Sequence, residues 1–397
     1  MNRFLSNILH TRIINKIDLS SNSINSIKSI DRTIYDAFGK LRVSEEYSLL
    51  EISFIKNYNN NQTSKKTIGD GSIILNDSYL ILSSLTGSTY IQSRTRGQYQ
   101  PGKSLLIMIT GVLNNGGLNT GITRLGYYDD SEGIFFECDN NINYIVKRKS
   151  GIDTRIIINN FDNTKTQIFW IDLTWLGVGD VRCGVYLNGM MSILYTFSHA
   201  NIELTPYMNY ANLFIRGYTS GNASLLFNCA TIISEGGFNP LGVLRSIDNH
   251  ITSINITNVS MKPLMALKIK SGITMIQLES FNIITTSVNT SIHYELFILK
   301  DTNTSLLLNS SWLTLNDTES YINYSYINTM TLNITTLTPI ISGYIGRNDS
   351  SVNLITNRYN NLLVTTNIDG ISDIAVLCAQ SLGNSVDCYS QILFKEL

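Results

Sequence analysis

The chain has 397 residues, of which 43% are hydrophobic and only 15% are charged, with a net charge of −1 and a pI near 6.4. A nearly neutral chain lacks the basic surface that nucleic acids and anionic membranes attract, so we expect neither as a partner. No apolar run reaches the roughly 18 residues of a transmembrane helix, and we therefore expect no membrane span.

The residue types favour strands over helices along the whole chain. Charged residues usually make up about 25% of a protein, and here Asn, Ser and Thr take much of their place. Ile, Thr, Tyr and Val fit pleated, half-buried surfaces, whereas the long charged helix formers are scarce. With 27 Gly and only 5 Pro, turns are left mainly to Gly, Asn and Asp, as in β-hairpins. These features predict an all-β fold.

Residues 1–46 are the first predicted unit, an N-terminal arm that ends in a signature segment. The segment Met1–His10 has one positive charge and a short apolar stretch, which His10 and Arg12 interrupt before a signal-peptide core is complete. We therefore expect no secretory signal. Terminal arms are usually loose unless a neighbour holds them, so docking on an adjacent subunit is one interpretation of this segment.

Residues 47–245 are predicted to form a first β-sandwich domain of jelly-roll type. Strand-like segments recur at short intervals, among them Ile73–Leu75, Leu105–Ile109, Ile134–Phe136, Ile168–Ile171 and Val181–Leu187. Turn residues separate them, as at 114–117 and 129–133. Regular short strands with turns between them are typical of sandwiches and jelly rolls.

Residues 246–397, after the Gly236–Pro240 break, are predicted to form a second, smaller β-sandwich domain in tandem with the first. The patterning is similar, for example at Met265–Lys270 and Tyr294–Leu299. No internal repeat of about 20–50 residues is visible, which argues against a solenoid or a propeller.

Gly97–Ser104 matches the spacing G-x-x-x-x-G-K-S of a phosphate-binding P-loop. That loop requires a buried strand before it and a helix after it, because the helix N-terminus and consecutive amides hold the phosphates. Here the preceding Gln92–Arg96 is polar and the following Leu105–Val112 is apolar and strand-like. We therefore predict no nucleotide binding and interpret Pro101-Gly102 as a turn between strands.

Acidic residues cluster at Asp129, Asp130 and Glu132, with Glu137 and Asp139 nearby. Glycoside hydrolysis needs two facing carboxylates about 5–9 Å apart, and adjacent residues on a turn point in different directions. The spacing also matches no calcium loop. We interpret the cluster as a solvated hairpin tip.

The four histidines, His10, His199, His250 and His293, have no Cys or His partner at metal-ligand spacing. A G-x-S-x-G elbow, as in serine hydrolases, is absent from the sequence. We therefore expect no catalytic residue, no metal, no cofactor and no enzymatic activity.

The five cysteines are odd in number and widely spaced: Cys138, Cys183, Cys229, Cys378 and Cys388. Most lie in apolar, strand-like surroundings, which predicts buried free thiols. Cys378 and Cys388 have the spacing of a pair across a hairpin, but a reducing compartment would keep such a pair reduced.

The segment Asp36–Glu45 resembles a D-A-F-G-R-L-R-V-S signature of virion structural proteins of tailed bacteriophages and large DNA viruses. Further pieces follow in the order expected of that group, at Arg94–Ser104, Gly126–Phe136, Trp175–Arg182 and His199–Asn201. The resemblance covers about residues 36–240 well and the C-terminal region only in general pattern.

Two departures from the group's pattern are visible. Lys40 stands where Arg is usual, and the stretch between Ile158 and Gln167 is shorter than the group's. The resemblance implies structural rather than catalytic roles for the residues that match it, namely Asp36, Ala37, Phe38, Gly39, Leu41, Arg42, Val43, Tyr99, Pro101, Gly102, Trp175, Leu176, Gly177 and Gly179.

The resemblance implies a non-enzymatic virion structural protein: a minor capsid, vertex or tail-associated subunit, made in the host cytoplasm and located in the virion. Its expected partners are other copies of itself, in a homo-oligomer, and other virion proteins. A neutral all-β chain suits such a subunit, which works by presenting surfaces. The alternative is a carbohydrate-binding receptor-recognition module, lectin-like or fibre, whose partner would be a host glycan. A sandwich-fold glycosidase would need a facing carboxylate pair that the sequence does not reveal.

Overall fold

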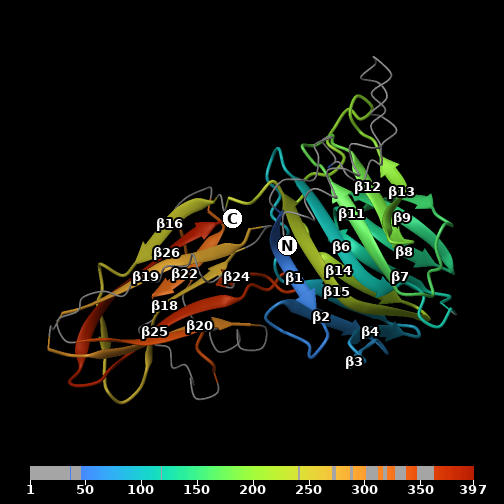
Figure 1. The fold of residues 1–397 in the computed structure, drawn as a ribbon. Coiled ribbons are helices and arrows are strands. Elements are labelled where there is room, and N and C mark those ends of the chain that lie inside the picture. The colour runs from blue at the N-terminus through green and yellow to red at the C-terminus, as the bar shows by residue number, and fades with distance from the viewer. Residues whose placement is uncertain are drawn as a thin grey trace, which may run out of the picture.

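The computed structural model describes residues 36, 46–117, 119–239, 242–270, 274–286, 289–300, 312–315, 320–326, 337–346 and 362–397. Within these ranges the regular elements are all β-strands, arranged in antiparallel sheets, and no helix occurs (Figure 1). The predicted all-β fold is confirmed. None of the described segments is a helix with the length and apolarity that crossing a bilayer requires.

Two sheets made from residues 46–235 lie against each other on the right of Figure 1. In the described chain, the eight-stranded sheet runs in the order β13 (Met190–Phe197), β12 (Val181–Leu187), β11 (Gln167–Leu173), β6 (Ser104–Val112), β15 (Ala223–Glu235), β4 (Tyr79–Ser84) and β3 (Ser72–Asn76), with β1 (Glu46–Ser53) also beside β15. The seven-stranded sheet runs in the order β10 (Ile152–Ile157), β9 (Ile142–Lys149), β8 (Gly133–Asp139), β7 (Ile122–Tyr128), β14 (Ile215–Ser220), β5 (Ser88–Ser93) and β2 (Thr63–Ile68).

One hydrophobic core lies between these two sheets. It takes Leu82 and Phe169 from the eight-stranded sheet and Ile91 and Phe136 from the seven-stranded sheet, all fully buried. The Phe136 and Phe169 rings meet across the sandwich, with their centroids 4.8 Å apart. Each large apolar side chain buried in this way contributes about 1.5–3 kcal/mol relative to an exposed one.

A second pair of sheets, made from residues 243–396, lies on the left of Figure 1. In the described chain, the five-stranded sheet runs in the order β16 (Val243–Asp248), β26 (Val386–Glu396), β19 (Ile276–Thr285) and β24 (Leu363–Val364), with β17 (Ile254–Ile256) also beside β26. The six-stranded sheet runs in the order β21 (Leu313–Thr314), β22 (Ile322–Tyr326), β18 (Lys262–Ile269), β25 (Ile374–Ser381), β20 (Ile292–Leu299) and β23 (Ile341–Ile345). Their shared core includes the Phe281 and Tyr294 rings, 5.3 Å apart.

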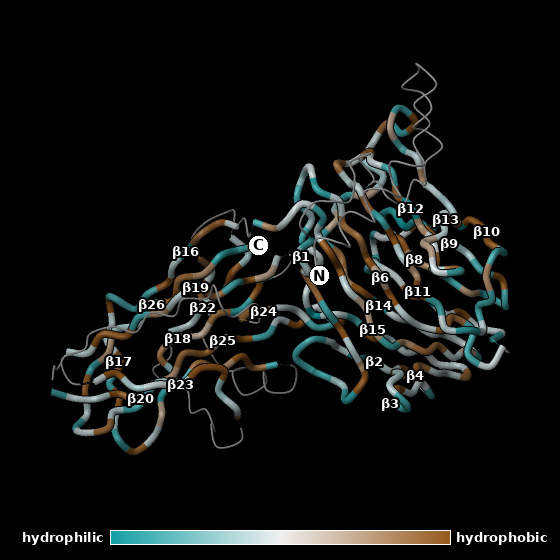
Figure 2. The backbone as a smooth tube through the Cα atoms, viewed as in Figure 1, coloured by the Kyte–Doolittle hydropathy of each residue, from teal (hydrophilic) through white to brown (hydrophobic). Residues whose placement is uncertain are grey.

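The sandwich architecture follows from the alternation of buried and exposed residues along the strands, and hydrophobic colours run along the strands of both pairs in Figure 2. The strand grouping changes between the end of β15 at Glu235 and the start of β16 at Val243. The exact domain limits and the jelly-roll assignment remain predictions. The predicted arm lies outside the described residues, except for Asp36, which is buried, and Glu46, with which β1 begins.

A buried ion pair joins the two pairs of sheets. The Arg94 guanidinium, just after β5, lies 3.2 Å from the Asp373 carboxylate, just before β25, and both side chains are 1% exposed. Further hydrogen bonds compensate their burial: Arg94 Nε donates to the Asn60 carbonyl at 2.7 Å, and the Thr365 hydroxyl donates to Asp373 at 2.6 Å. Without such bonds, two buried charges would be costly.

The loop between β24 and β25 makes the neighbouring contacts. The backbone N–H of Ile368 donates to the Ser64 hydroxyl at 3.2 Å, and Lys66 pairs with Asp369 at 2.6 Å on the surface. Lys300, at the end of β20, donates to the Asn61 carbonyl at 3.2 Å. Polar contacts therefore fix how the two pairs of sheets meet.

We predict that Asp373→Ala lowers the free energy of unfolding by about 3–5 kcal/mol, because it leaves the Arg94 guanidinium buried without its carboxylate. Asp369→Ala is the matched control, since it removes an ion pair that is about 40% exposed and should leave the free energy of unfolding nearly unchanged. Urea denaturation followed by tryptophan fluorescence measures both. Equal, small losses would show that the buried pair does not hold the two halves together.

Candidate functional site

The outer face of the seven-stranded sheet carries a group of arginines, tyrosines and carboxylates, which we call the arginine–tyrosine face. Along β7 the side chains of Leu125 and Tyr127 enter the core, so Arg124 and Tyr128 lie on the opposite face. The face is made up of Tyr90, Arg124, Tyr128, Phe135, Glu137, Tyr144, Arg148, Asp153, Arg155, Arg216 and Tyr218.

Strand register places five of these residues in one row across the sheet. Tyr90 of β5 is opposite Tyr218 of β14, which is opposite Arg124 of β7. Arg124 is opposite Glu137 of β8, which is opposite Tyr144 of β9. Directly opposed side chains are close enough to interact, so the row is a continuous strip of three aromatic rings and one ion pair.

The Glu137 carboxylate lies between two guanidinium groups. Its Oε2 atom is 2.6 Å from Arg124 Nε and its Oε1 atom is 2.9 Å from Arg155 Nε, while its own side chain is fully buried. A buried carboxylate is stable only when paired, and here strands on both sides of β8 supply the positive charge.

Asp153 makes the second close pair on this face. Both of its oxygens accept hydrogen bonds from Arg148, at 2.7 and 2.9 Å, in the bidentate geometry that a planar guanidinium favours. Burial raises the pKa of Asp153, but the bonds to Arg148 and the charges of Arg148, Arg124 and Arg155 outweigh it and lower the pKa below its usual value.

An aromatic pair lies beside these charges. The Tyr128 and Phe135 rings are 4.4 Å apart, and both are at most 2% exposed. The Arg216 guanidinium is 5.4 Å from the Tyr128 ring, and those of Arg148 and Arg124 are 5.0 and 5.3 Å from the Phe135 ring. Cation–π attraction operates at these distances, so three arginines converge on one pair of rings.

Tyr90 and Tyr218 form the more accessible part of the face. Their ring centroids are 4.6 Å apart and both side chains are half-buried. The Arg124 guanidinium lies 5.4 Å from the Tyr218 ring, which fixes that ring from its other side. The arrangement offers aromatic surface next to oriented hydrogen-bonding groups, which are the elements of a binding site.

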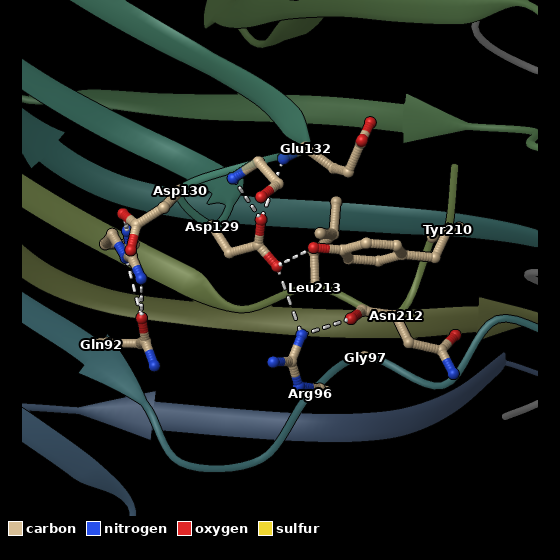
Figure 3. A network of polar contacts seen from close by, with 12 residues as sticks. Gln92, Arg96, Gly97, Asp129, Asp130, Glu132, Tyr210, Asn212 and Leu213 are labelled. Atoms are coloured by element: carbon tan, nitrogen blue, oxygen red, sulfur yellow. Dashed lines mark hydrogen bonds and ion pairs between the residues drawn. The ribbon is translucent and has the colours of Figure 1, made fainter. Parts of the chain in front are cut away.

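A second network lies at the end of the sheet, centred on Asp129 (Figure 3). Asp129 Oδ2 accepts a hydrogen bond from the Tyr210 hydroxyl at 2.8 Å and lies 3.4 Å from an Arg96 nitrogen. Its Oδ1 atom accepts the backbone N–H groups of Ser131 and Glu132, both at 2.9 Å. Asp129 thus ties the turn after β7 to the loops that contain Arg96 and Tyr210.

The interpretation of the acidic cluster as a solvated hairpin tip was wrong for two of its members. Asp129 is 7% exposed and Glu132 is fully buried, and only Asp130 projects into solvent. Glu132 accepts hydrogen bonds from the Asn209 amide at 2.6 Å and from the Ser150 backbone at 3.0 Å. These partners come from distant parts of the chain and compensate the burial of the carboxylates.

The later pieces of the virion-protein resemblance meet at this end of the sandwich. The Tyr99 and Trp175 rings pack edge to face at 5.7 Å, and the Leu176 backbone N–H donates to the Tyr99 hydroxyl at 3.2 Å. The carbonyl of Gly179 lies 2.7 Å from Nδ1 of His199. Four of the quoted signature residues therefore contribute to one contact network with His199.

Backbone geometry explains the glycines in this group. Gly177 has a φ of +83°, which side-chain-bearing residues rarely adopt, and a Cβ at Gly179 would lie 2.0 Å from the Thr174 carbonyl oxygen. Gly102 has the same φ of +83° in the turn with Pro101, so the predicted turn is confirmed. The signature residues Ala37, Phe38, Gly39, Leu41, Arg42 and Val43 lie outside the described residues.

His199 is buried inside this network. Its ring stacks on Tyr207 with the centroids 3.9 Å apart, and its Nε2 atom has no hydrogen-bond partner among the described residues. Burial lowers the pKa of His199, and the charge of Lys147 acts in the same direction, against the hydrogen bond to Gly179. The ring is therefore held neutral.

The P-loop-like segment serves as a structural turn. Ser104 begins strand β6, and its hydroxyl donates to Glu235 at 2.6 Å. Lys103 donates to the Gln100 side chain at 2.8 Å and to the Gly237 carbonyl at 2.9 Å. The predicted strand after this segment is confirmed, and the lysine and serine side chains are occupied by contacts within the chain.

No group of three or more His, Cys, Asp or Glu side chains that could hold a metal ion occurs among the described residues. All five cysteines are free thiols, four of them buried and Cys229 partly exposed, which agrees with the prediction for four. Cys378 and Cys388 lie in different sheets, so they do not face each other across a hairpin. Burial raises the pKa of Cys388 to about 12, which keeps the thiol protonated and unreactive.

A cleft of about 530 Å³ lies where the two pairs of sheets meet. Its walls include Leu49 and Glu51 of β1, and Lys300 and Thr365 of the second pair. Gln62 already binds the Glu51 carbonyl at 3.2 Å, and Thr365 and Lys300 are engaged with Asp373. Several of the polar groups that line the cleft are therefore already engaged within the chain.

The arginine–tyrosine face was not predicted from the sequence. The sequence contains a signal for it in the alternation of side chains along β7 and β9. Core residues such as Leu125 and Ile145 point to the inner face of the sheet, so Arg124 and Arg148 point to the outer face. Charged residues at every second position of a strand indicate a surface of ion pairs or a functional surface. The sequence does not show which strands are neighbours, so it does not show which of these residues are in contact.

No protein-family model matches this chain, and no curated protein matches it. Among solved structures, similarity is found to an endo-1,3-beta-glucanase from Streptomyces sioyaensis, with 10% identity, 48% of this chain and 97% of that chain covered, and a TM-score of 0.39. A legume lectin-like domain from Entamoeba histolytica has 10% identity, coverages of 47% and 97%, and a TM-score of 0.35. The Ca²⁺/Man3GlcNAc-bound exoplasmic/lumenal domain of VIP36 has 11% identity, coverages of 48% and 90%, and a TM-score of 0.35. Because these TM-scores lie below 0.5, we infer nothing from them about ligand or activity.

We predict that acidification lowers the free energy of unfolding of the protein because of His199. A histidine in the unfolded chain takes up a proton as the pH falls below about 6.5, whereas the buried ring takes one up only at lower pH. The contribution of His199 to stability is therefore fully present above about pH 6.5 and is lost as the pH falls towards the folded-state pKa. Urea denaturation at pH 7.5 and 5.5 should show a smaller difference for His199→Gln than for the wild type. His250→Gln, at a side chain that is 75% exposed, is the control, and an equal change in both variants would contradict the assignment.

Proposed function

We propose that this chain is a non-enzymatic recognition module that binds carbohydrate on the arginine–tyrosine face. The observation that carries the proposal is the row of Tyr90, Tyr218 and Tyr144 with the Arg124–Glu137 ion pair among them. The rings are partly accessible, and strand pairing fixes their spacing.

The chemistry of this row suits a polyhydroxylated ligand. A sugar ring presents an apolar C–H face, which packs on an aromatic ring, and hydroxyl groups at its edge, which exchange hydrogen bonds with guanidinium and carboxylate groups. Tyr218 is held between Tyr90 at 4.6 Å and the Arg124 guanidinium at 5.4 Å, so little side-chain entropy remains to be lost on binding.

The pairing of the carboxylates supports a binding role over hydrolysis. A glycosidase needs one protonated acid and one accessible carboxylate, facing each other across the scissile bond. On this face Glu137 is buried between two arginines, and both oxygens of Asp153 are bonded to Arg148. Carboxylates that are bonded to guanidinium groups suit orientation of a ligand better than proton donation.

We predict that Tyr218→Ala weakens glycan binding by about tenfold or more, because it removes the central ring of the row. A glycan array followed by calorimetry on a bound glycan measures the change. Tyr186→Ala is the matched control, since Tyr186 is an exposed tyrosine of the other sheet of the same sandwich. Absence of glycan binding by the wild type, or an equal loss in Tyr186→Ala, would exclude this site.

A second candidate function is that of a virion structural subunit, and the convergence of the signature segments favours it. Tyr99 lies far in the sequence from Trp175, Gly177 and Gly179, but all four help to hold together the loops at one end of the sandwich. Residues that match the virion-protein signature and also contact one another in the fold are less expected from a chance match of short sequence segments. In this reading the protein is located in the virion and assembles with copies of itself.

The loops next to these residues expose apolar side chains that suit an interface. Leu176 and Val178 project from one loop, and Ile202 and a fully exposed Leu204 project from the next. The two loops are joined where the Tyr207 backbone N–H donates to the Gly177 carbonyl at 2.9 Å. Exposed apolar patches of this kind mark protein contacts, and we infer a second copy of the chain as the partner.

For this second candidate we predict an oligomer that Leu204→Glu dissociates towards the monomer, because the new charge would be buried at the interface. Light scattering of the purified protein gives the mass of each species. Leu85→Glu, at an exposed leucine outside these loops, should leave the mass unchanged. A wild-type protein that stays monomeric at high concentration would remove the support for self-assembly through these loops.

A further inference from the structure

The Tyr128 hydroxyl is a buried polar group on the arginine–tyrosine face. Tyr128 is 2% exposed, and its hydroxyl has no partner among the described residues. Buried hydroxyl groups are almost always bonded to protein or water, so an orphaned one next to a binding surface indicates a missing acceptor.

The surroundings of this hydroxyl are positively charged. The guanidiniums of Arg216 and Arg148 lie 5.4 and 5.8 Å from the Tyr128 ring, and that of Arg124 lies 5.3 Å from the neighbouring Phe135 ring. Burial raises the pKa of Tyr128, while the charges of Arg216, Arg124 and Arg148 lower it. An acceptor that fits this position carries negative charge.

The three arginines differ in how firmly they are paired. Arg124 is 2.6 Å from the buried Glu137, and Arg148 has a bidentate pair with Asp153. Arg216 is 5% exposed; its Nε and Nη2 atoms donate to the Gln92 side-chain oxygen, and its Nη1 atom pairs at 2.5 Å with Asp130, which is 85% exposed. An ion pair with one partner in solvent is worth little, so the Asp130 carboxylate is the one that a ligand can replace.

We propose that the glycan bound by this face is acidic, and that its oxyanion binds Arg216 in place of Asp130 and accepts the hydrogen bond of the Tyr128 hydroxyl. This inference rests on the proposed carbohydrate-binding function. Carboxylate and sulfate groups share the required chemistry, because each presents charged oxygens that can accept hydrogen bonds from Arg216 Nη1 and from the Tyr128 hydroxyl.

The register of β14 places the anion site next to the aromatic row. Arg216 and Tyr218 are two residues apart on the same face of the strand, about 7 Å along its axis. That spacing is close to the width of one sugar ring. An acidic sugar can therefore place its oxyanion at Arg216 while its ring, or the next ring of the chain, packs on Tyr218 and Tyr90.

The test compares acidic glycans with neutral counterparts of the same backbone, by calorimetry at fixed ionic strength. Oligogalacturonate and its methyl ester probe a carboxylate, and dextran sulfate and dextran probe a sulfate. We expect at least one acidic glycan to bind about tenfold or more tightly than its neutral counterpart, which is the effect of one good charged contact. The arm that shows the preference identifies the oxyanion.

Two conservative variants assign the preference to this site. Asp130→Asn removes the competing carboxylate at an exposed position, so it should tighten binding of the acidic glycan about threefold or more and leave its neutral counterpart unchanged. Tyr128→Phe removes only the hydroxyl, so it should weaken binding of the acidic glycan by more than it weakens binding of the neutral counterpart.

The outcomes separate this inference from the function on which it rests. If neutral and acidic glycans bind equally, lose binding in Tyr218→Ala and do not respond to Asp130→Asn, then the acidic preference is refuted and carbohydrate binding stands. If no glycan of either kind binds, both proposals fail together.

Discussion

The position of nearly every functional group in the first sandwich depends on the pleat of β7. Leu125 and Tyr127 must enter the core between the two sheets, which forces Arg124 and Tyr128 onto the outer face. A slip of one residue would bury a guanidinium in the core and expose a leucine, so the hydrophobic core fixes the register of the charged face. Gly126 is part of the same constraint, because a Cβ there would lie 2.4 Å from the Cα of Phe135.

Buried charge in this protein is consistently compensated by groups from distant segments. Glu137 is held by Arg124 of β7 and Arg155 of β10, Glu132 by Asn209, and Asp373 of the second sandwich by Arg94 of the first. In each case a carboxylate in a dry environment specifies one partner and one geometry, because the unpaired alternative is costly. The low charge content of the chain is therefore misleading: many of its few charges determine where loops and sheets meet.

Local pattern was enough to predict the strands, but not the site. The segment Val181–Leu187 and the turn at Pro101-Gly102 were identified from residue type and spacing alone, because propensity and turn chemistry are local properties. Asp129 was misread as solvated because Arg96 and Tyr210, which make its burial acceptable, are remote in sequence. The arginine–tyrosine face was not predicted for the same reason. Its residues come together only when β5, β14, β7, β8, β9 and β10 are paired in register.

The charge balance of the arginine–tyrosine face has a consequence for the kinetics of any encounter there. Its four arginines are paired with four carboxylates, Asp130, Glu137, Asp139 and Asp153, so the formal charges of the paired groups balance. A ligand is then not steered from a distance, and association proceeds at the ordinary rate set by diffusion and orientation. Different ligands would then differ mainly in their dissociation rates. These rates depend on the hydrogen bonds and ion pairs that each ligand forms with the face after contact. If many copies of this face were presented on one surface, the strength of ligand binding would depend on how slowly each ligand dissociates rather than on how fast it associates.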